Sequence, residues 1–185
     1  MTTPPRPAPL CDRLGEMGVA DTPRILPLLE EIRKRIPWTD SAWEALFEGA
    51  RAAPDPTLYF LNLSKLCDSL PPEDLAQAVA RPENLPVLGA LLGGSESLPE
   101  QIARRRELFS ALFLEGGVAR PGDPGALLSD AKGLADRCGD EEEIKRGLRQ
   151  LRLREMARIA ARDLAGLAAL PEVTGDLSSL ASAAL

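Results

Sequence analysis

The feature of this chain that most constrains its fold is the alternation of helix-breaking residues with periodic apolar residues. Proline and glycine divide the sequence into pieces of helical length, and within each piece the apolar residues recur at intervals of three and four. That spacing places them along one face of an α-helix, whereas no run alternates with the period of two that a half-buried strand requires. The pattern predicts an all-α fold, with prolines and glycines between the helices and not inside them.

The choice of apolar residues supports the same fold class. The chain has 32 Leu and 26 Ala against 5 Val and 6 Ile, with seven aromatic residues in all. Leucine and alanine lose little side-chain entropy in a helix, while sheets favour β-branched and aromatic residues. Composition therefore indicates helices independently of spacing.

Capping signals predict where the helices begin. Thr22-Pro23 and Asp55-Pro56 each combine an N-capping residue with a proline at the first helical position, and Thr39 or Asp40 caps a further helix. The helix after Asp55 is apolar on most of its surface, so we expect it at the centre of the core. The predicted helices cover residues 22–36, 39–50, 55–70, 72–80, 82–92, 97–114, 124–138, 140–170 and 172–185.

Two regions are predicted from this order of elements. Residues 1–20 form a flexible, proline-rich leader with a first short helix, since residues 1–9 contain four prolines and lack the apolar stretch of a secretory signal. Residues 21–185 form a single helical domain. Successive helices joined by short turns favour a multi-helix array of antiparallel, partly solenoid-like helix pairs.

Charge and cysteine usage limit the partners and the compartment. The formal net charge of −6 disfavours nonspecific binding to nucleic acid or to an anionic membrane surface. No apolar run reaches the 18 residues of a membrane helix. Cys11, Cys67 and Cys138 are far apart and form no Cys-x-x-Cys pair, which suits a reducing compartment. We expect a cytoplasmic protein that binds neither nucleic acid nor membrane.

Residues for catalysis are scarce. The chain has no histidine, which excludes Ser-His-Asp and Cys-His activation of a nucleophile. Gly94-Ser95 is similar to the phosphate-holding turn of nucleotidyltransferases, but no Asp-x-Asp pair follows to hold Mg²⁺, so we interpret it as an interhelical turn. We interpret Cys67 and Tyr59 as packing residues, the latter with its hydroxyl at an edge of the core. The sequence predicts no catalytic residue and no metal site.

The acidic run from Asp140 to Glu143 fits helix capping better than metal binding, because Asp140 and Glu143 have the spacing of an N-cap and its third helical residue. It opens the longest periodic run of the chain, a helix near the C-terminus rich in arginine. Ile144, Leu148, Leu151, Met156 and Ile159 are its predicted core stripe.

Basic residues form two stripes beside that core stripe: Lys145, Arg149 and Arg152 on one side, and Arg154, Arg158 and Arg162 on the other. Glu155 lies close to the apolar stripe, so we expect it to pair with Arg152 or Arg158. Two interpretations stay open. The cations form a solvated face with i,i+4 pairs, or Arg149, Arg152, Arg154, Arg158 and Arg162 face an anion or a neighbouring domain, because guanidinium groups suit carboxylate and phosphate.

The arginine-rich run carries a family resemblance. Residues 148–164, with the pattern Leu-Arg-x-x-Arg-x-Arg-Glu-x-x-Arg-Ile-x-x-Arg-Asp-Leu, and the following Leu-Ser-Ser-Leu-Ala at 177–181 resemble the bifunctional glutamine synthetase adenylyltransferase and adenylyl-removing enzymes. The turn at 91–98 and the helix at 58–66 are similar to the same family more weakly. The family's Arg-x-Pro-Glu segment is replaced here by Arg104-Arg-Arg-Glu without proline, which leaves the local helix boundary open.

The resemblance implies a function for a larger enzyme. Such an enzyme uses Mg²⁺ and ATP to attach AMP to glutamine synthetase, removes that AMP by phosphorolysis, and is controlled by the signal protein PII. This chain is expected to be the noncatalytic helical region before the AMP-removing nucleotidyltransferase domain, which is its own downstream partner. None of the family's catalytic residues falls on a position of this chain, so no cofactor is expected here. A stand-alone helical scaffold or protein-interaction module is the alternative.

Overall fold

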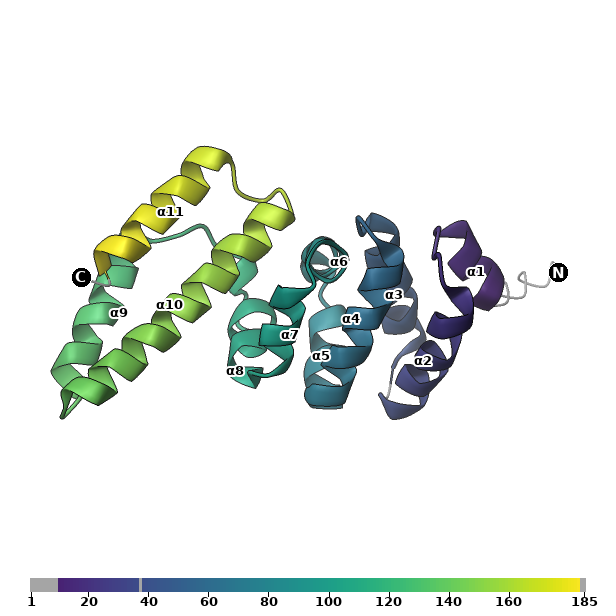
Figure 1. Ribbon diagram of the computed structural model, residues 1–185, viewed down its shortest axis with the longest axis horizontal. Helices are drawn as coiled ribbons and strands as arrows, with labels where there is room; N and C mark the ends of the chain where they lie inside the picture. Colours follow the sequence, from purple (N-terminus) through teal and green to yellow (C-terminus); the bar gives the residue numbers. More distant parts are fainter. Residues whose placement is uncertain (1–9, 37, 184–185) are drawn as a thin grey trace. The chain divides into compact units, whose positions relative to one another are not determined.

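In the computed structural model, residues 10–36 and 38–183 are described, and among them every regular element is a helix or helical turn. The prediction of an all-α fold is confirmed (Figure 1). The predicted proline-rich leader at residues 1–9 lies outside the described residues, as does Pro37. None of the described helices has the length and apolar content to cross a membrane.

The helices form two compact units, one up to Arg104 and one from Arg105 onward, where the sequence predicts a single domain from residue 21. Unit 1 contains α1 (Leu10–Glu16), α2 (Thr22–Arg35), α3 (Asp40–Ala52), α4 (Pro56–Ser69), α5 (Pro72–Val79), the 3₁₀ turn η1 (Pro82–Asn84), α6 (Leu85–Gly94) and α7 (Ser97–Ala103). Unit 2 contains α8 (Arg106–Phe109), the π turn η2 (Ser110–Leu114), the 3₁₀ turn η3 (Gly117–Ala119), α9 (Pro124–Arg137), α10 (Glu141–Leu164) and α11 (Leu170–Ala183).

The boundary between the units falls inside a predicted helix. Residues 97–114 are split because Arg105 adopts extended backbone (φ −141°, ψ 93°) between α7 and α8. Neither proline nor glycine marks this break. The periodic pattern continues across it, so the sequence alone predicts one helix here.

Local capping chemistry explains most helix starts. The predicted N-caps Thr39, Asp55 and Asp140 are confirmed, each with its side-chain oxygen accepting a backbone N–H of the first turn. α2 is capped by Asp21, one residue before the predicted Thr22. Such caps satisfy N–H groups that have no partner within the helix, so they depend on a few consecutive residues only.

The long helix α10 ends earlier than predicted, at Leu164 and not near residue 170. Gly166 has a positive φ of 66°. The amide of Leu167 donates to the carbonyl of Arg162, and the amide of Gly166 donates to that of Asp163. These two bonds form a Schellman motif, which glycine favours because it carries no Cβ.

α4 is the central helix of unit 1, as predicted, and packs against α2, α3, α6 and α7. Its Phe60 and Tyr59 are fully buried, with ring centroids 5.2 Å apart at an edge-to-face angle. Phe47 of α3 lies 5.9 Å from Phe60 and 5.5 Å from Trp43. A continuous row of four aromatic rings therefore runs through this core.

The prediction that breakers lie only between helices is wrong in both units, since glycines also lie inside α9, α10 and α11. Pro27 lies inside α2, and Gly49, Gly89 and Gly93 lie inside α3 and α6. A Cβ on Gly89 would come within 2.6 Å of the Gly49 carbonyl oxygen, and one on Gly93 within 2.7 Å of the Ala53 Cβ. These glycines serve close packing of α6 on α3, which outweighs their helix-weakening tendency.

Unit 2 has a smaller apolar core between α9, α10 and α11. Its buried members are Leu127, Ala131, Leu151, Ile159, Val173 and Leu180. None of these is aromatic; the buried rings of unit 2, Phe109 and Phe113, lie in α8 and η2 with centroids 5.1 Å apart.

Candidate functional site

The first turn of α10 is a capping site. The amide of Glu143 donates to Asp140 Oδ1 (2.8 Å), and Glu143 Oε2 in return accepts the amide of Gly139 (3.1 Å). Lys145 forms an ion pair with Glu141 (2.7 Å). Within residues 10–36 and 38–183, no group of three His, Cys, Asp or Glu side chains could hold a metal ion.

Arg158, in the C-terminal half of α10, is nine-tenths buried and faces carboxylates of its own unit. Its Nε donates to Glu155 Oε2 (2.8 Å) and its Nη2 to Asp176 Oδ2 of α11 (2.7 Å). Nη1 reaches the carbonyl of Arg120 (3.4 Å). Burial opposes the charge on Arg158, but the hydrogen bonds to Glu155 and Asp176 outweigh it and raise the pKa of the guanidinium above its usual value.

Arg162, one turn later, is 5% exposed and binds three separate segments. Nη1 donates to the carbonyl of Val118 in η3 (2.9 Å). Nη2 donates to the carbonyl of Leu167 (3.1 Å) and to Glu172 Oε1 of α11 (2.8 Å). Its Nε is buried and has no hydrogen-bond partner among the described atoms.

The two arginines form what we call the arginine brace: Arg158 and Arg162 of α10 with Asp176 and Glu172 of α11. Each pair has i,i+4 spacing, so each lies along one face of its helix. Gly122 completes the site, because a Cβ there would come within 2.0 Å of Asp176 Oδ1. The brace holds α11 and the loop before α9 on α10.

The remaining predicted arginines are more exposed. Arg154 is 45% exposed at its side chain and pairs with Asp130 (3.0 Å) and Glu155 (3.2 Å). Arg149 and Arg152 are exposed, and no ion pair with another described residue is formed by either. Exposed pairs contribute roughly 0–1 kcal/mol, so only the brace is expected to matter for stability.

The structure answers part of the prediction for this helix. Glu155 pairs with Arg158, one of its two predicted partners, and with Arg154. The anions that Arg158 and Arg162 face are internal carboxylates, which leaves little of either side chain for an external ligand or domain. It stays a prediction that an external anion or a neighbouring domain is faced by Arg149, Arg152 and Arg154.

Sequence reasoning missed the acidic half of the brace. Glu172 and Asp176 have the same i,i+4 spacing as Arg158 and Arg162, which was a usable signal. The prediction that Met156 belongs to the core stripe is wrong, because this residue is 41% exposed. Met156 is not part of the unit 2 core, to which Leu151 and Ile159 of the same helix belong.

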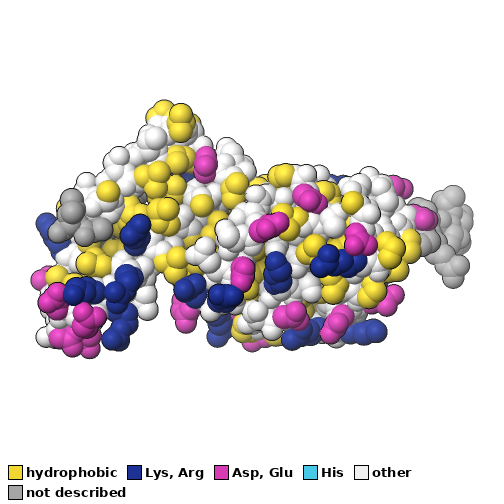
Figure 2. Space-filling model, in the orientation of Figure 1, with side chains coloured by type: hydrophobic (Ala, Val, Ile, Leu, Met, Phe, Trp, Pro, Cys, Tyr) yellow, Lys and Arg dark blue, Asp and Glu magenta, His cyan; other side chains and the backbone are white. Residues whose placement is uncertain are grey.

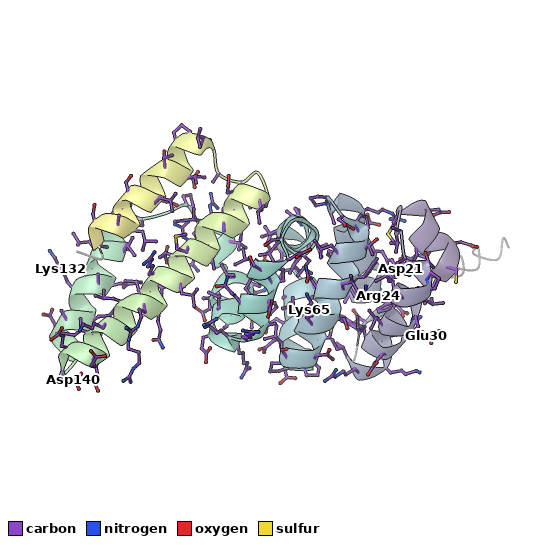
Figure 3. All side chains as sticks on the ribbon, in the orientation of Figure 1. Asp21, Arg24, Glu30, Lys65, Lys132 and Asp140 are labelled. Carbon is purple, nitrogen blue, oxygen red and sulfur yellow. The ribbon has the colours of Figure 1, made fainter. Side chains whose placement is uncertain are left out.

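The Gly94-Ser95 turn is an interhelical turn, as interpreted. Buried Asn62 of α4 donates through Nδ2 to the carbonyls of Leu92 (2.8 Å) and Ser95 (3.0 Å). Ser95 Oγ accepts the amide of Leu98 (3.2 Å) at the start of α7. Lys65, labelled in Figure 3, donates to Asn62 Oδ1 (2.9 Å) and lies at the rim of an open groove between α2, α4 and α7.

Tyr59 and Cys67 are packing residues, but the Tyr59 hydroxyl is not at an edge. It is fully buried and lacks a hydrogen-bond partner among the described atoms. Burial raises the pKa of Tyr59 well above its usual value. Burial, with a smaller effect of Asp68, raises the pKa of Cys67 to about 12. A thiol with that pKa is almost entirely protonated near neutral pH, which makes Cys67 a poor nucleophile.

A family model described as glutamate-ammonia ligase adenylyltransferase matches residues 85–185, which include the whole of unit 2. Among curated proteins, a bifunctional glutamine synthetase adenylyltransferase/adenylyl-removing enzyme of Pseudomonas aeruginosa is 37% identical over 112 residues, 60% of this chain and 11% of that protein. The enzyme of the same name from Thioalkalivibrio sulfidiphilus is 44% identical over 78 residues, 42% of this chain and 8% of that protein.

The corresponding enzyme of Mycobacterium bovis is 33% identical over 134 residues, 69% of this chain and 13% of that protein. The chain thus spans only about a tenth of the length of the curated relatives it matches. No solved structure matches the chain.

Proposed function

The chain belongs to the glutamate-ammonia ligase adenylyltransferase family, and from that premise we propose that it is a noncatalytic helical region of an enzyme that adds AMP to glutamine synthetase and removes it. In this proposal the region precedes the AMP-removing nucleotidyltransferase domain. Glutamine synthetase is the protein substrate of the whole enzyme, ATP and Mg²⁺ are its cofactors, and PII is its regulator.

The observation that carries the proposal is the family match over all of unit 2, a unit whose buried arginines serve internal carboxylates and carbonyls. Nucleotidyl transfer requires clustered oxygen ligands for Mg²⁺. The sequence has no Asp-x-Asp pair and no histidine. The chemistry is therefore assigned to another part of the enzyme, and this region is assigned a supporting role.

Exposed apolar residues on unit 2 are evidence that a neighbouring domain packs against it. The large apolar residues that are clearly exposed in the described chain all belong to unit 2: Leu128, Met156, Leu164, Leu167, Leu170 and Leu177. Leu164, Leu167 and Leu170 are clustered at the turn between α10 and α11, and Leu170 is 75% exposed. Hydrophobic side chains gather over α10 and α11 on the face shown in Figure 2. Exposed apolar clusters are typical of interfaces, and we assign this one to the nucleotidyltransferase domain.

The predicted apolar stripe of the last helix is partly internal. Leu180 is buried in the unit 2 core, whereas Leu177 and Ala181 are exposed. Ala184 and Leu185 lie outside the described residues. The proposed domain interface is therefore centred on the turn before α11.

The test compares this chain with a protein extended through the following domain of its reading frame. The chain alone should neither add AMP to glutamine synthetase nor remove it, and calorimetry should show no binding of ATP with Mg²⁺. In the extended protein, L167S combined with L170S should lower AMP removal about tenfold, since two apolar contacts are lost. The same double change should leave the unfolding of the chain alone nearly unaltered. L128S, a change on α9 at a residue about as exposed as Leu167, should alter neither.

Turnover by the chain alone would contradict the noncatalytic assignment. A reading frame that never reaches a Gly-Ser and Asp-x-Asp motif would favour the alternative, a stand-alone helical scaffold. Hydrogen exchange adds an independent measurement: residues 164–177 should become more protected in the extended protein than in the chain alone.

A further inference from the structure

A groove in unit 2 lies apart from the arginine brace. Its volume is about 580 Å³, and it is lined by residues of α8, α9 and α10. Its floor is apolar: Leu108 and Leu151 are buried, and Leu134 and Leu153 are half-buried. Two neighbouring helices with leucines between them form the kind of surface that accepts a third helix.

Gly147 of α10 shapes this floor. A Cβ on Gly147 would come within 2.8 Å of Leu134 Cδ2, so the glycine allows Leu134 of α9 to lie against the α10 backbone. Glycine inside a helix costs about 1 kcal/mol relative to alanine. The close packing of Leu134 against the backbone at Gly147 offsets this cost.

The rim of the groove is basic. Arg105 and Arg137 line it, are exposed, and form no ion pair with another described residue. Arg154 lines it too, but its charge is offset by Asp130. Glu107 is the other acidic residue among those lining the groove. Three arginines against two carboxylates leave the lining with one excess positive charge, in a chain whose net charge is −6. The two arginines without an ion pair, Arg105 and Arg137, favour an acidic partner.

The chain itself shows which partner such helices accept. α11 packs on another face of the same α9–α10 pair, with apolar Val173 and Leu180 inserted between them. Its Glu172 and Asp176 pair with Arg162 and Arg158 of α10. An apolar helix with flanking carboxylates is thus the ligand that fits the leucines and arginines of this helix pair.

We propose that the groove formed by α8, α9 and α10 is a docking site for an acidic amphipathic helix of a partner protein. Leucine-like side chains at i, i+4 and i+7 would enter between Leu134 and Leu153, and flanking carboxylates would meet Arg105 and Arg137. The proposal does not depend on the enzyme assignment above, since it concerns binding by this chain alone.

The probe is a fluorescein-labelled helical peptide of about 18 residues, with leucine at those three spacings and glutamate at the flanking positions. Fluorescence anisotropy should give a dissociation constant of roughly 10–100 µM at low salt. R137E should weaken binding about tenfold. K132E is the matched control. Lys132 (Figure 3) is on the same helix as Arg137 but does not line the groove, and both substitutions replace a cation by glutamate. It should change the affinity less than about twofold.

L153S tests the floor. It should also weaken the peptide about tenfold, while the thermal unfolding of the variant stays close to that of the parent chain. Three results would each overturn the proposal. The first is equal binding by R137E and K132E, and the second is equal binding of a peptide with lysine in place of glutamate. The third is no binding at about 0.5 mM peptide, which is well above the expected dissociation constant of roughly 10–100 µM. Hydrogen exchange showing that the peptide opens α11 would also overturn it, since the peptide would then occupy the place of α11 and not the groove.

Discussion

Unit 1 and unit 2 are both helical, but different forces hold them. Unit 1 is built on a row of buried aromatic rings, Trp43, Phe47, Phe60 and Tyr59, and on glycines that bring α6 close to α3. Unit 2 buries the Phe109–Phe113 ring pair near its start, but the core between α9, α10 and α11 is aliphatic, and its last helix is tied down by the arginine brace. Unit 1 is therefore held chiefly by apolar packing, and unit 2 depends on charge pairs as well.

Apolar packing and buried ion pairs respond differently to changes in structure. Apolar burial is non-directional and proportional to area, so the helices of unit 1 tolerate small shifts without losing what holds them together. Buried ion pairs must overcome the desolvation of both charges, so the net stability that the brace adds is small, whereas removing one partner leaves a buried charge unpaired and is costly. Unit 2 also presents the exposed leucines and the basic groove, consistent with a unit that is completed by its partners.

The two units can be followed separately. Both tryptophans and the one tyrosine of the chain, Trp38, Trp43 and Tyr59, are in unit 1. Tryptophan fluorescence therefore reports the unfolding of unit 1, while far-ultraviolet circular dichroism reports the helices of both units.

The largest effect is expected from F60A in unit 1. Phe60 is fully buried and touches two other rings, so its removal should lower the free energy of unfolding by about 4 kcal/mol. Urea titration followed by tryptophan fluorescence measures the change. A loss below about 1 kcal/mol would mean that the aromatic row is not what holds unit 1.

In unit 2 the corresponding test is R162M. It leaves Glu172 and the Val118 carbonyl without their charged donor, and should destabilise unit 2 by about 3 kcal/mol. Circular dichroism should show earlier loss of helix while the fluorescence transition of unit 1 is unchanged. R149M, on an exposed face of the same helix, should cost less than about 0.5 kcal/mol. Equal losses of stability in R162M and R149M would show that the arginine brace does not hold unit 2 together.

Glycines sharpen the contrast with opposite signs. G89A places a methyl group within 2.6 Å of the Gly49 carbonyl oxygen, and should destabilise unit 1 by about 2 kcal/mol. G175A, in α11, meets nothing within 4 Å, and should stabilise unit 2 by about 0.5–1 kcal/mol. Thermal melts of both variants check the signs. Stabilisation by G89A would show that α6 and α3 can separate at little cost.

The smallest effect is expected from Y59F. It removes a buried hydroxyl that has no hydrogen-bond partner among the described atoms, so stability should stay within about 0.5 kcal/mol or rise slightly. Fluorescence-monitored urea titration against the parent chain measures it. A loss above about 1 kcal/mol would show that the hydroxyl binds an ordered water in solution.

Local signals in the sequence were sufficient for the fold class and for most helix starts. The caps at Thr39, Asp55 and Asp140 each depend on a side chain and a backbone amide within three residues of it, so consecutive residues suffice to predict them. The end of α10 was missed although its signal, Gly166, is local too. The periodic pattern extended past that glycine and outweighed it in the prediction.

Residues close together in the chain suffice to predict that it is helical, where most helices begin, and that one helix is rich in arginine. The division at Arg105, the internal partners of Arg158 and Arg162, and the packing role of Gly89 follow instead from how the helices pack. Capping and periodicity are interactions between near neighbours along the chain. Which carboxylate an arginine meets, and how closely two helices approach, depend on residues far apart in sequence, so those outcomes follow only from how the helices pack.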